Sequence, residues 1–367
     1  MITHIMVQVL KLKNSISTVR VCAAVFCLLL IIGCVISPRR TVGGGGGTPT
    51  PTPSPTPTPN PAATGKLYVS NGGANSILRF DNALTAGGNL TPAATISGAN
   101  TTLNAPAFIT LDAIADRLYV ANNGDISILI FDNISTKKGN VAPERTIFGS
   151  LTTLTTPTDV ALDRGRDLLY VADDIDIHVF ASASAANGNV APARNLSPGF
   201  SVSAIFIDAA NDRLFAADQA DNAIAIYDNA STLNGPVTAS RVVQGVATHL
   251  ATPGGLQVDG SGRLVVSNAS PASITIYTNA AIANGNIAPV AEIKGSNTGF
   301  SVPDQIVVNP SGTGTLYNAD PGAARVAIYA NFSTANGNIA PTRSINGANT
   351  TLTVGGQPVG VALDNTR

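Results

Sequence analysis

Aspartate recurs at equivalent positions along this chain of 367 residues. The set consists of Asp112, Asp163, Asp208, Asp259 and Asp364, with Asn309 in the same place in a sixth copy. A ring of carboxylate and amide side chains could hold a metal ion. Asp and Asn also cap tight turns, because their side chains accept hydrogen bonds from the backbone a few residues further on. A residue that is present in every repeat is expected to stabilise the repeated unit itself, so we assign this set to turns rather than to a metal site.

Few other side chains could do chemistry. Asp159 and Asp304 are acids outside the repeated set, and His249 lies in a Thr-rich segment. A general base needs a partner within hydrogen-bonding distance, and the sequence places none beside His249, so we expect no catalysis there. We interpret His178 as a strand residue and the run from Asp173 to Asp176 as a solvated acidic loop. Nucleophile elbows and phosphate-binding glycine loops are absent from the sequence.

A repeated segment sets the positions of these residues. Ala335-Asn336-Gly337-Asn338-Ile339-Ala340-Pro341 has near copies toward the N-terminus. Their glycines are Gly88, Gly139, Gly188, Gly235, Gly285 and Gly337, and the spacings are 47 to 52 residues. A period of about 50 residues is typical of propellers and solenoids. We assign the Asn-Gly pairs within the segment to tight turns, where a left-handed backbone is tolerated.

Each repeat divides into four short segments with strand character. In one copy they are Pro157 to Asp163, Leu168 to Ala172, Ile175 to Phe180, and a weaker segment after Pro192. These segments are rich in β-branched and aromatic residues and are bounded by Gly, Pro, Asn or Asp, which is the pattern of strands and turns. No segment of the repeats has a helical period, so the sequence predicts an all-β fold.

The two ends of the repeat array are out of phase. The array starts at Gly65 with a second strand and stops at Asp364 with a first strand that lacks a partner. In a ring, Pro358 to Asp364 would complete the sheet that Leu67 begins, which removes exposed edges. We therefore predict a six-bladed β-propeller of four-stranded blades over residues 65–367, closed by the C-terminal strand in the N-terminal blade. A right-handed β-helix is the alternative fold.

The pattern Pro157-x-x-Val160-Ala161-Leu162-Asp163 followed by Leu168-Leu169-Tyr170-Val171-Ala172-Asp173 resembles NHL-type and YVTN-type propeller repeats. The resemblance covers residues 65–367. It implies a propeller that serves as a binding platform, a scaffold or, in some relatives, an enzyme. Strongly charged positions of those repeats are mostly replaced here by Ala, Thr and Asn.

We expect the binding face to be formed by the loops that lead into the first strands and by those between the second and third strands. Phe200, His249 and Phe300 lie in these loops, and Asp159 and Asp304 are predicted at the mouth of the central channel. The two acids belong to first strands three blades apart, which are opposite each other in a ring of six. They are therefore too far apart to share one ion at the ~2.3 to 2.6 Å of calcium ligands.

A calcium-dependent, lactonase-like hydrolase with its site at the central channel is the alternative function. Resemblance to six-bladed lactonases would imply a calcium ion held by a Glu and several Asn or Asp residues in the channel. Glu144 and Glu292 instead fall on fourth strands, at the blade periphery. Because no Glu matches that pattern, we expect no cofactor in the main hypothesis and calcium only in the alternative.

Residues 1–34 have the pattern of an export signal. Basic residues precede an apolar run from Val21 to Ile32, and Leu30-Ile31-Ile32-Gly33-Cys34 resembles the lipobox of bacterial lipoproteins. This resemblance implies cleavage before Cys34 and lipidation of its thiol. Val35 rather than Asp follows, which favours the outer membrane. The alternatives are an uncleaved anchor helix, for which the run is shorter than the ~20 residues of a span, and an ordinary secretory signal.

Residues 35–64 are predicted to be a linker. Five glycines, Gly43 to Gly47, precede alternating Thr and Pro up to Pro61, which combines a flexible joint with an extended spacer. The three cysteines, Cys22, Cys27 and Cys34, all precede it, so the predicted propeller contains no disulfide.

The charge balance argues against nucleic acid. The chain has 21 Lys and Arg against 22 Asp and Glu, and three of the basic residues fall in the signal. Such a surface lacks a positive footprint for phosphate. The sequence therefore predicts an exported, lipid-anchored protein of the bacterial cell envelope. Its propeller acts as a non-catalytic binding or scaffolding module for a protein or small-molecule ligand.

Overall fold

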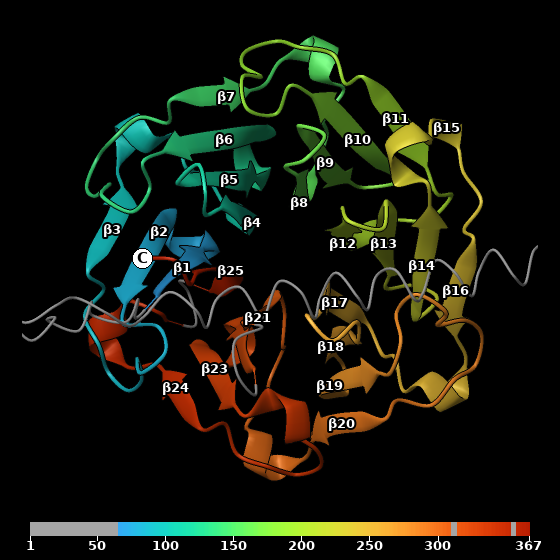
Figure 1. The fold of residues 1–367 in the computed structure, drawn as a ribbon. Coiled ribbons are helices and arrows are strands. Elements are labelled where there is room, and N and C mark those ends of the chain that lie inside the picture. The colour runs from blue at the N-terminus through green and yellow to red at the C-terminus, as the bar shows by residue number, and fades with distance from the viewer. Residues whose placement is uncertain (1–64, 310–313, 354–356) are drawn as a thin grey trace, which may run out of the picture. The chain divides into compact units, whose positions relative to one another are not determined.

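The computed structural model describes residues 65–309, 314–353 and 357–367. They form six antiparallel sheets arranged as blades around a central channel, which confirms the six-bladed β-propeller (Figure 1). Residues from Asn60 to Arg367 make up one compact unit, and every hydrophobic cluster lies within it. The predicted signal, Cys34 and the predicted linker lie outside the described residues.

The blades are numbered here in chain order, and their strands are given from the channel outward. Blade 1 contains β25 (Pro358–Asp364), β1 (Lys66–Asn71), β2 (Ser76–Asp81) and β3 (Ala94–Ser97). Blade 2 contains β4 (Pro106–Asp112), β5 (Arg117–Asn122), β6 (Ser127–Asp132) and β7 (Arg145–Ile147). Blade 3 contains β8 (Pro157–Asp163), β9 (Leu168–Asp173), β10 (Asp176–Ala181) and β11 (Arg194–Ser197).

The other three blades follow the same plan. Blade 4 contains β12 (Val202–Asp208), β13 (Arg213–Asp218), β14 (Ala223–Asp228) and β16 (Arg241–Gln244). Blade 5 contains β17 (Pro253–Val258), β18 (Leu264–Ala269), β19 (Ala272–Tyr277) and β20 (Ala291–Lys294). Blade 6 contains β21 (Ile306–Asn309), β22 (Thr315–Asp320), β23 (Arg325–Ala330) and β24 (Arg343–Ile345).

The C-terminal strand closes the ring as the sequence predicts. β25 pairs with β1 in antiparallel register, with Lys66 opposite Asp364 and Val69 opposite Val361. In Figure 1 the red C-terminal strand accordingly lies beside the blue N-terminal one. The first blade is thus built from both ends of the domain, and neither β1 nor β25 leaves a free edge at that junction.

The ring has two faces. On the loop face, inner strands begin and second strands end; on the turn face, inner strands turn into second strands. Short 3-10 helices on the loop face are η1 (Gly72–Ala74), η2 (Ala99–Thr101), η3 (Asn123–Asp125), η4 (Ser150–Thr152), η6 (Val246–Thr248), η7 (Ser296–Thr298), η8 (Pro321–Ala323) and η10 (Ala348–Thr350). The turn face carries η5 (Ala230–Thr232) and η9 (Phe332–Thr334). The described chain enters at Gly65 and ends at Arg367, both on the turn face.

Hydrophobic clusters fill the spaces between neighbouring blades. One such cluster brings Tyr119 and Ile130 of blade 2 against Leu169 and Phe180 of blade 3. Because each sheet is covered on both faces, its middle strands are apolar on both sides rather than alternating. This is why the second strands read as continuous runs such as Leu-Tyr-Val.

The repeated Asn-Gly-Asn segment joins each blade to the one before it. Gly285 of blade 5 donates its N–H to the carbonyl of Val242 in blade 4 at 2.6 Å, and its carbonyl accepts from Gln244. Asn284 accepts a hydrogen bond from Val242, and Asn286 accepts one from Ala247. We call this segment the clasp. Within each predicted Asn-Gly pair the left-handed residue is the glycine, such as Gly285 with φ +70°.

The eroded copy of the clasp makes a short strand. β15 (Gly235–Pro236) runs parallel to β11, with Gly235 opposite Leu196, and adds a fifth strand to the sheet of blade 3. Other clasps make single parallel bridges, such as Gly139 with Ile96. Each clasp thus covers part of an outer strand edge.

Candidate functional site

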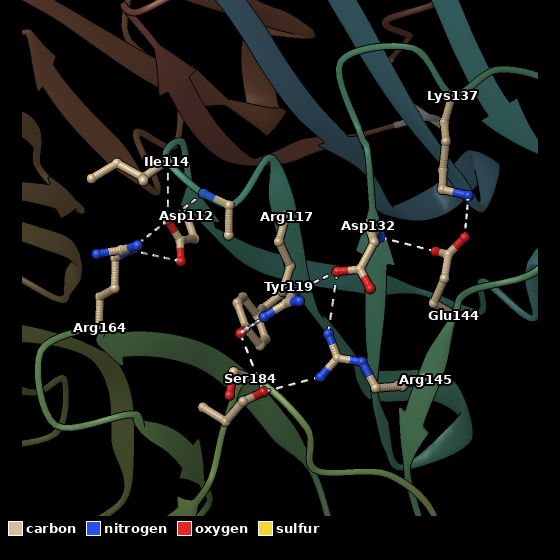
Figure 2. A network of polar contacts seen from close by, with 12 residues as sticks. Asp112, Ile114, Arg117, Tyr119, Asp132, Lys137, Glu144, Arg145, Arg164 and Ser184 are labelled. Atoms are coloured by element: carbon tan, nitrogen blue, oxygen red, sulfur yellow. Dashed lines mark hydrogen bonds and ion pairs between the residues drawn. The ribbon is translucent and has the colours of Figure 1, made fainter.

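The repeated aspartates lie on the turn face and act as turn caps. Asp112 accepts hydrogen bonds from the N–H groups of Ile114 and Ala115, and Arg164 of blade 3 reaches it at 3.1 Å (Figure 2). Other members of the set accept backbone hydrogen bonds in the same way: Asp163, Asp208, Asp259 and Asp364. The assignment to turns is confirmed for these residues.

Arginine side chains near the turn face tie neighbouring blades together. Figure 2 shows Asp132 held between Arg117 and Arg145, both from blade 2. Arg145 also donates to the carbonyl of Ala183 in blade 3, which the Tyr119 hydroxyl shares. These contacts leave the turn-face charges occupied by the scaffold.

Three side chains from different blades line the cavity of the central channel. Asp159 of blade 3 accepts hydrogen bonds from the N–H groups of Val160 and Ile205, at 2.7 and 2.8 Å. Phe108 of blade 2 belongs to a cluster that includes residues of blades 4 and 5. Gln305 of blade 6 crosses to blades 1 and 2, as described below. We call Phe108, Asp159 and Gln305 the plug.

The side chain of Gln305 connects blade 6 to blades 1 and 2. Its Oε1 accepts from the N–H of Val361 at 2.8 Å and from the N–H of Ile109 at 3.3 Å, while its Nε2 donates to the carbonyl of Ile109. Space for this side chain exists because position 360 is glycine: a Cβ there would lie 2.9 Å from Oε1. A cavity of about 190 Å³ continues from the plug along the inner strands of all six blades.

The two acids predicted at the channel mouth differ in environment. Asp159 is only 2% exposed. Burial raises its pKa well above the ordinary value, and the charge of Asp304 raises it further, against the two N–H donors that lower it. Asp304 is half-buried and faces Gly254 of blade 5, where a Cβ would lie 3.1 Å from its Oδ1. Burial, with the charge of Asp320, raises the pKa of Asp304 to about 7.

Asp304 also lacks partners. No described residue donates a hydrogen bond to its carboxyl group, whereas its backbone carbonyl accepts from Ser267 and Asn318. Asn318 is fully buried, and its Oδ1 has no hydrogen-bond partner among the described residues. The boundary between blades 5 and 6 therefore contains acceptor oxygens that the described chain does not use.

His249 has a partner that the sequence did not place. Its Nδ1 lies 2.9 Å from Oε2 of Glu292, which Lys294 also approaches at 2.7 Å. Glu292 and Lys294 belong to β20, the outermost strand of blade 5. The ring of His249 is 46% exposed at the blade periphery and does not join Asp159 or Asp304.

The two phenylalanines pack into different blade interfaces. Phe200 lies against the cluster between blades 3 and 4, and Phe300 against the cluster between blades 5 and 6. The ring of Phe300 lies 5.8 Å from that of Tyr329, with the guanidinium of Arg325 5.9 Å away. They do not form one apolar patch. The connection before β12, which carries Phe200, has no 3-10 helix, in keeping with its short length.

The structure contains a buried pair that sequence reasoning missed. Nε2 of His178 lies 3.0 Å from Asp173 and Nδ1 lies 2.7 Å from Asn195. Burial lowers the pKa of His178, but these hydrogen bonds outweigh it and raise the pKa overall. Asp173 also accepts from the N–H groups of Thr155 and Thr156. It is 3% exposed, so its assignment to a solvated acidic loop is wrong.

A second repeated set could have revealed this role. Second strands carry an Asx residue at or next to their last position: Asn71, Asn122, Asp173, Asp218, Asn268 and Asp320. Several of them accept N–H groups of the loop that enters the same blade, as Asn122 does from Asn104 and Asp320 does from Val302. These Asx residues stabilise loops of the loop face, as the repeated aspartates stabilise turns of the turn face.

The loop face stores backbone strain that the turn face avoids. On the turn face the described non-glycine residues with positive φ are all Asn, Asp or Ser: Asn82, Asp116, Asn133, Asp167, Ser182, Asp212, Asn229 and Asn331. On the loop face they include Thr102, Ala105, Ile126, Thr153, His249, Thr252, Ala324, Thr351 and Gln357. Positive φ is unfavourable for β-branched residues and is tolerated by Asn and Asp. The costly positions are therefore concentrated on one face.

Within residues 65–309, 314–353 and 357–367, no group of three or more His, Cys, Asp or Glu side chains is placed to hold a metal ion. No helix in this part of the chain has the length and hydropathy needed to cross a bilayer.

Comparison with known proteins supports the fold but identifies no family. No protein-family model matches the chain, and no curated protein matches its sequence. Among solved structures, it is similar to a chain in the crystal structure of a nidogen/laminin complex. That match has a TM-score of 0.55 and 14% identity, and it covers 82% of this chain and 98% of the other. At this identity the similarity shows a propeller fold alone.

Proposed function

We propose that this protein is a non-catalytic binding or scaffolding module that engages its partner through the loop face. The distribution of backbone strain carries the proposal. Thr102, Thr153 and Thr351 hold positive φ at equivalent loop positions, at a cost of order 1 kcal/mol or more each. Such strain persists where the fold over-determines it, and it clusters at functional sites. A face whose loops only connect strands would use Asn or Asp there, as the turn face does.

The position of the chain ends supports the same choice of face. The described chain enters the propeller at Gly65 on the turn face. A tether attached there leaves the loop face unobstructed. We propose that this tether is the linker of residues 35–64 and that it ends in a lipidated Cys34 in the outer membrane, a proposal that rests on the lipobox-like segment of the sequence. The NHL-type or YVTN-type character of the repeats is part of the same proposal.

A protein partner is favoured over a small molecule on this face. The loops offer exposed Thr and Asn side chains, and the described residues contain no group of His, Cys, Asp or Glu side chains placed to hold a metal ion. The structurally similar chain was determined in a nidogen/laminin complex, which is consistent with protein recognition by a propeller of this fold.

Matched substitutions on the two faces test the proposal. Thr102 and Asn82 are both exposed and both have positive φ, but they lie on the loop face and the turn face. Thr102→Arg should abolish capture of the envelope protein that the wild-type chain retains after crosslinking, while Asn82→Arg should keep it. Loss of capture in Asn82→Arg alone would refute the assignment of the face.

The lipid anchor needs a separate test. Cells that express the full chain should incorporate radiolabelled palmitate into it and retain it in the outer-membrane fraction. Cys34→Ser should remove both the label and the membrane retention. Unchanged labelling in Cys34→Ser would exclude this anchor without touching the proposal for the loop face.

The lactonase-like alternative has one observation in its favour, the unpartnered carboxyl group of Asp304 at the boundary of blades 5 and 6. Titration of residues 60–367 with calcium and then chelator tests it, since a ligand of the folded state raises the melting temperature. A chelator-reversible rise that Asp304→Asn removes would favour the alternative. A flat response would leave the binding module as the function.

A further inference from the structure

Six backbone N–H groups point into the channel just beside the plug. They belong to Ile109, Val160, Ile205, Leu256, Ile306 and Val361, one from each inner strand. All six residues are at most 6% exposed. In antiparallel pairs, alternate residues direct their N–H groups toward the partner strand or away from it. A β-bulge at the start of the inner strands decides which residues direct their N–H groups away from the second strand. In blade 6 the same arrangement places two residues, Asp304 and Gln305, opposite the single residue Ala319.

The plug satisfies these groups in pairs from neighbouring blades. Asp159 accepts both Val160 of blade 3 and Ile205 of blade 4. Oε1 of Gln305 accepts both Val361 of blade 1 and Ile109 of blade 2. One pair is left, Leu256 of blade 5 and Ile306 of blade 6.

No described residue offers an acceptor to the remaining pair. Leu256 and Ile306 sit opposite Val266 and Asn318, in the same register as the four residues already paired with the plug. The position equivalent to Asp159 in blade 5 is Gly255. A Cβ there would lie 2.8 Å from the backbone oxygen of Asp304, so close packing keeps a side chain out. An unmade hydrogen bond of a buried group costs about 1 to 3 kcal/mol.

The surroundings define what could fill this gap. Leu256 and Ile306 line the cavity of about 190 Å³, together with Phe206, Val307 and other apolar residues. Its lining contains no Lys, Arg or His. Asp159, the acid in the lining, cannot carry positive charge, so the cavity offers no cation to pair with an anion. An engineered apolar cavity of ~150 Å³ holds benzene, so one ring with a small substituent fits the available volume.

We propose that the channel binds a small neutral molecule with an apolar body and a carbonyl oxygen, and that this oxygen accepts the hydrogen bonds of Leu256 and Ile306. The site is separate from the loop face of the proposed function. Ligand binding there completes the third pair of the ring, as Asp159 and Gln305 complete the other two.

Three probes that share one ring test the chemistry. Residues 60–367, the compact unit, are labelled with ¹⁵N and titrated at pH 8 with benzamide, benzoate and benzene. Benzamide should bind with a Kd of about 1 mM or below and shift the amide protons of Leu256 and Ile306 downfield. Benzoate and benzene should bind at least tenfold more weakly, because one is an anion and the other has no acceptor. Binding is also checked with the full chain in detergent.

A cavity-filling variant locates the probe. Ala161 lines the cavity in blade 3, and the equivalent residue of blade 4 is Phe206, so the ring already accommodates Phe once. Ala161→Phe should weaken benzamide binding at least tenfold. Ile282→Phe adds the same ring at a 72% exposed turn-face position and should leave binding unchanged.

Several results would overturn the proposal. Leu256 and Ile306 amides that stay unshifted up to about 10 mM benzamide would mean that water alone satisfies them. Benzoate binding as tightly as benzamide would refute the neutral ligand class. An Ala161→Phe variant that binds benzamide as tightly as the wild type would show that benzamide binds outside the channel. If Ala161→Phe does not fold, the wild-type amide shifts still decide the outcome.

Discussion

Replacement of Asp304 by Asn should stabilise the propeller in a pH-dependent way. Burial raises the pKa of Asp304 from its ordinary value of 3.8 to about 7. Each unit of that difference corresponds to about 1.4 kcal/mol, so full ionisation costs the folded state up to about 4 kcal/mol. Because the side chain is half-buried, solvent relieves part of this cost, and we expect a gain of about 1 to 4 kcal/mol at pH 8. The amide forfeits no hydrogen bond, since the described residues give the carboxyl none.

The sign of the pH dependence follows from the direction of the shift. Below pH 3.8 the carboxyl is protonated in both states, and the variant gains nothing. Between pH 3.8 and 7 the unfolded chain ionises while the folded chain keeps its proton, so the wild type loses stability as pH rises. Above pH 7 the loss is complete. The difference between Asp304→Asn and wild type should therefore grow from pH 4 to pH 8.

Urea unfolding of both proteins at pH 4, 6 and 8 measures this difference directly, with tyrosine fluorescence and circular dichroism as probes. The slope of free energy against urea should stay constant between them. A difference that is the same at all three pH values, or a variant less stable than wild type at pH 8, would refute the reasoning. Either result would mean that Asp304 reaches solvent or an ion in the folded protein.

Three further outcomes follow from contacts elsewhere in the ring. Arg241 and Arg213 hold the pKa of Asp228 down to about 2, so Asp228→Asn should cost about 1 kcal/mol at pH 7, discounted for exposure, and the loss should fade as pH drops toward 2 in urea titrations. Gly285 has φ +70° and open space around a Cβ, whereas a Cβ at Gly245 would lie 2.5 Å from Oδ1 of Asn286. Thermal unfolding should therefore show a loss of stability of about 1 to 2 kcal/mol for Gly285→Ala and a clearly larger loss for Gly245→Ala. Equal losses for the two variants would contradict the role of the clasp. Deletion of residues 358–367 should abolish the sharp thermal transition and cause aggregation, because β1 keeps only β2 and its other edge is exposed along its whole length. Deletion of 365–367 should keep the transition, and light scattering and calorimetry distinguish the two.

The sequence predicts the fold well because the relevant information is local and repeated. A period of about 50 residues with four apolar segments permits few architectures. The phase mismatch between Leu67 and Asp364 then decides between an open array and a ring. The turn-face aspartates are also predictable, since a cap acts within a few residues of itself. None of these inferences requires knowledge of which blades touch.

The site resists prediction because it depends on contacts between distant blades. Asp159 and Asp304 look alike in sequence as acids in first strands three blades apart. The β-bulge in blade 3 directs Asp159 into the channel, where two backbone donors hold it. Gln305 is uncharged and has no feature in the sequence that indicates a role, yet it connects blade 6 to blades 1 and 2. The pairing of His178 with Asp173 likewise depends on strand register.

The clasp motif shows the same limit. The sequence displays Asn-Gly-Asn six times with variations, and a local reading assigns it to a turn. Its hydrogen bonds instead go to the outer strand of the preceding blade and to the loop after it, as those of Gly139 and Asn140 do to Thr95 and Asn100. A period reveals that a segment matters to every blade without revealing what it touches.

Closure by β25 also fixes the order of events during synthesis. β1, β2 and β3 are made first, but the inner strand that completes their sheet is made only after the other five blades. Since β1 pairs with β25 across nearly the whole domain, this contact has the highest loop-closure cost in the fold. The first blade must wait for β25, so a nascent or truncated chain keeps an open, protease-sensitive ring until that strand has emerged.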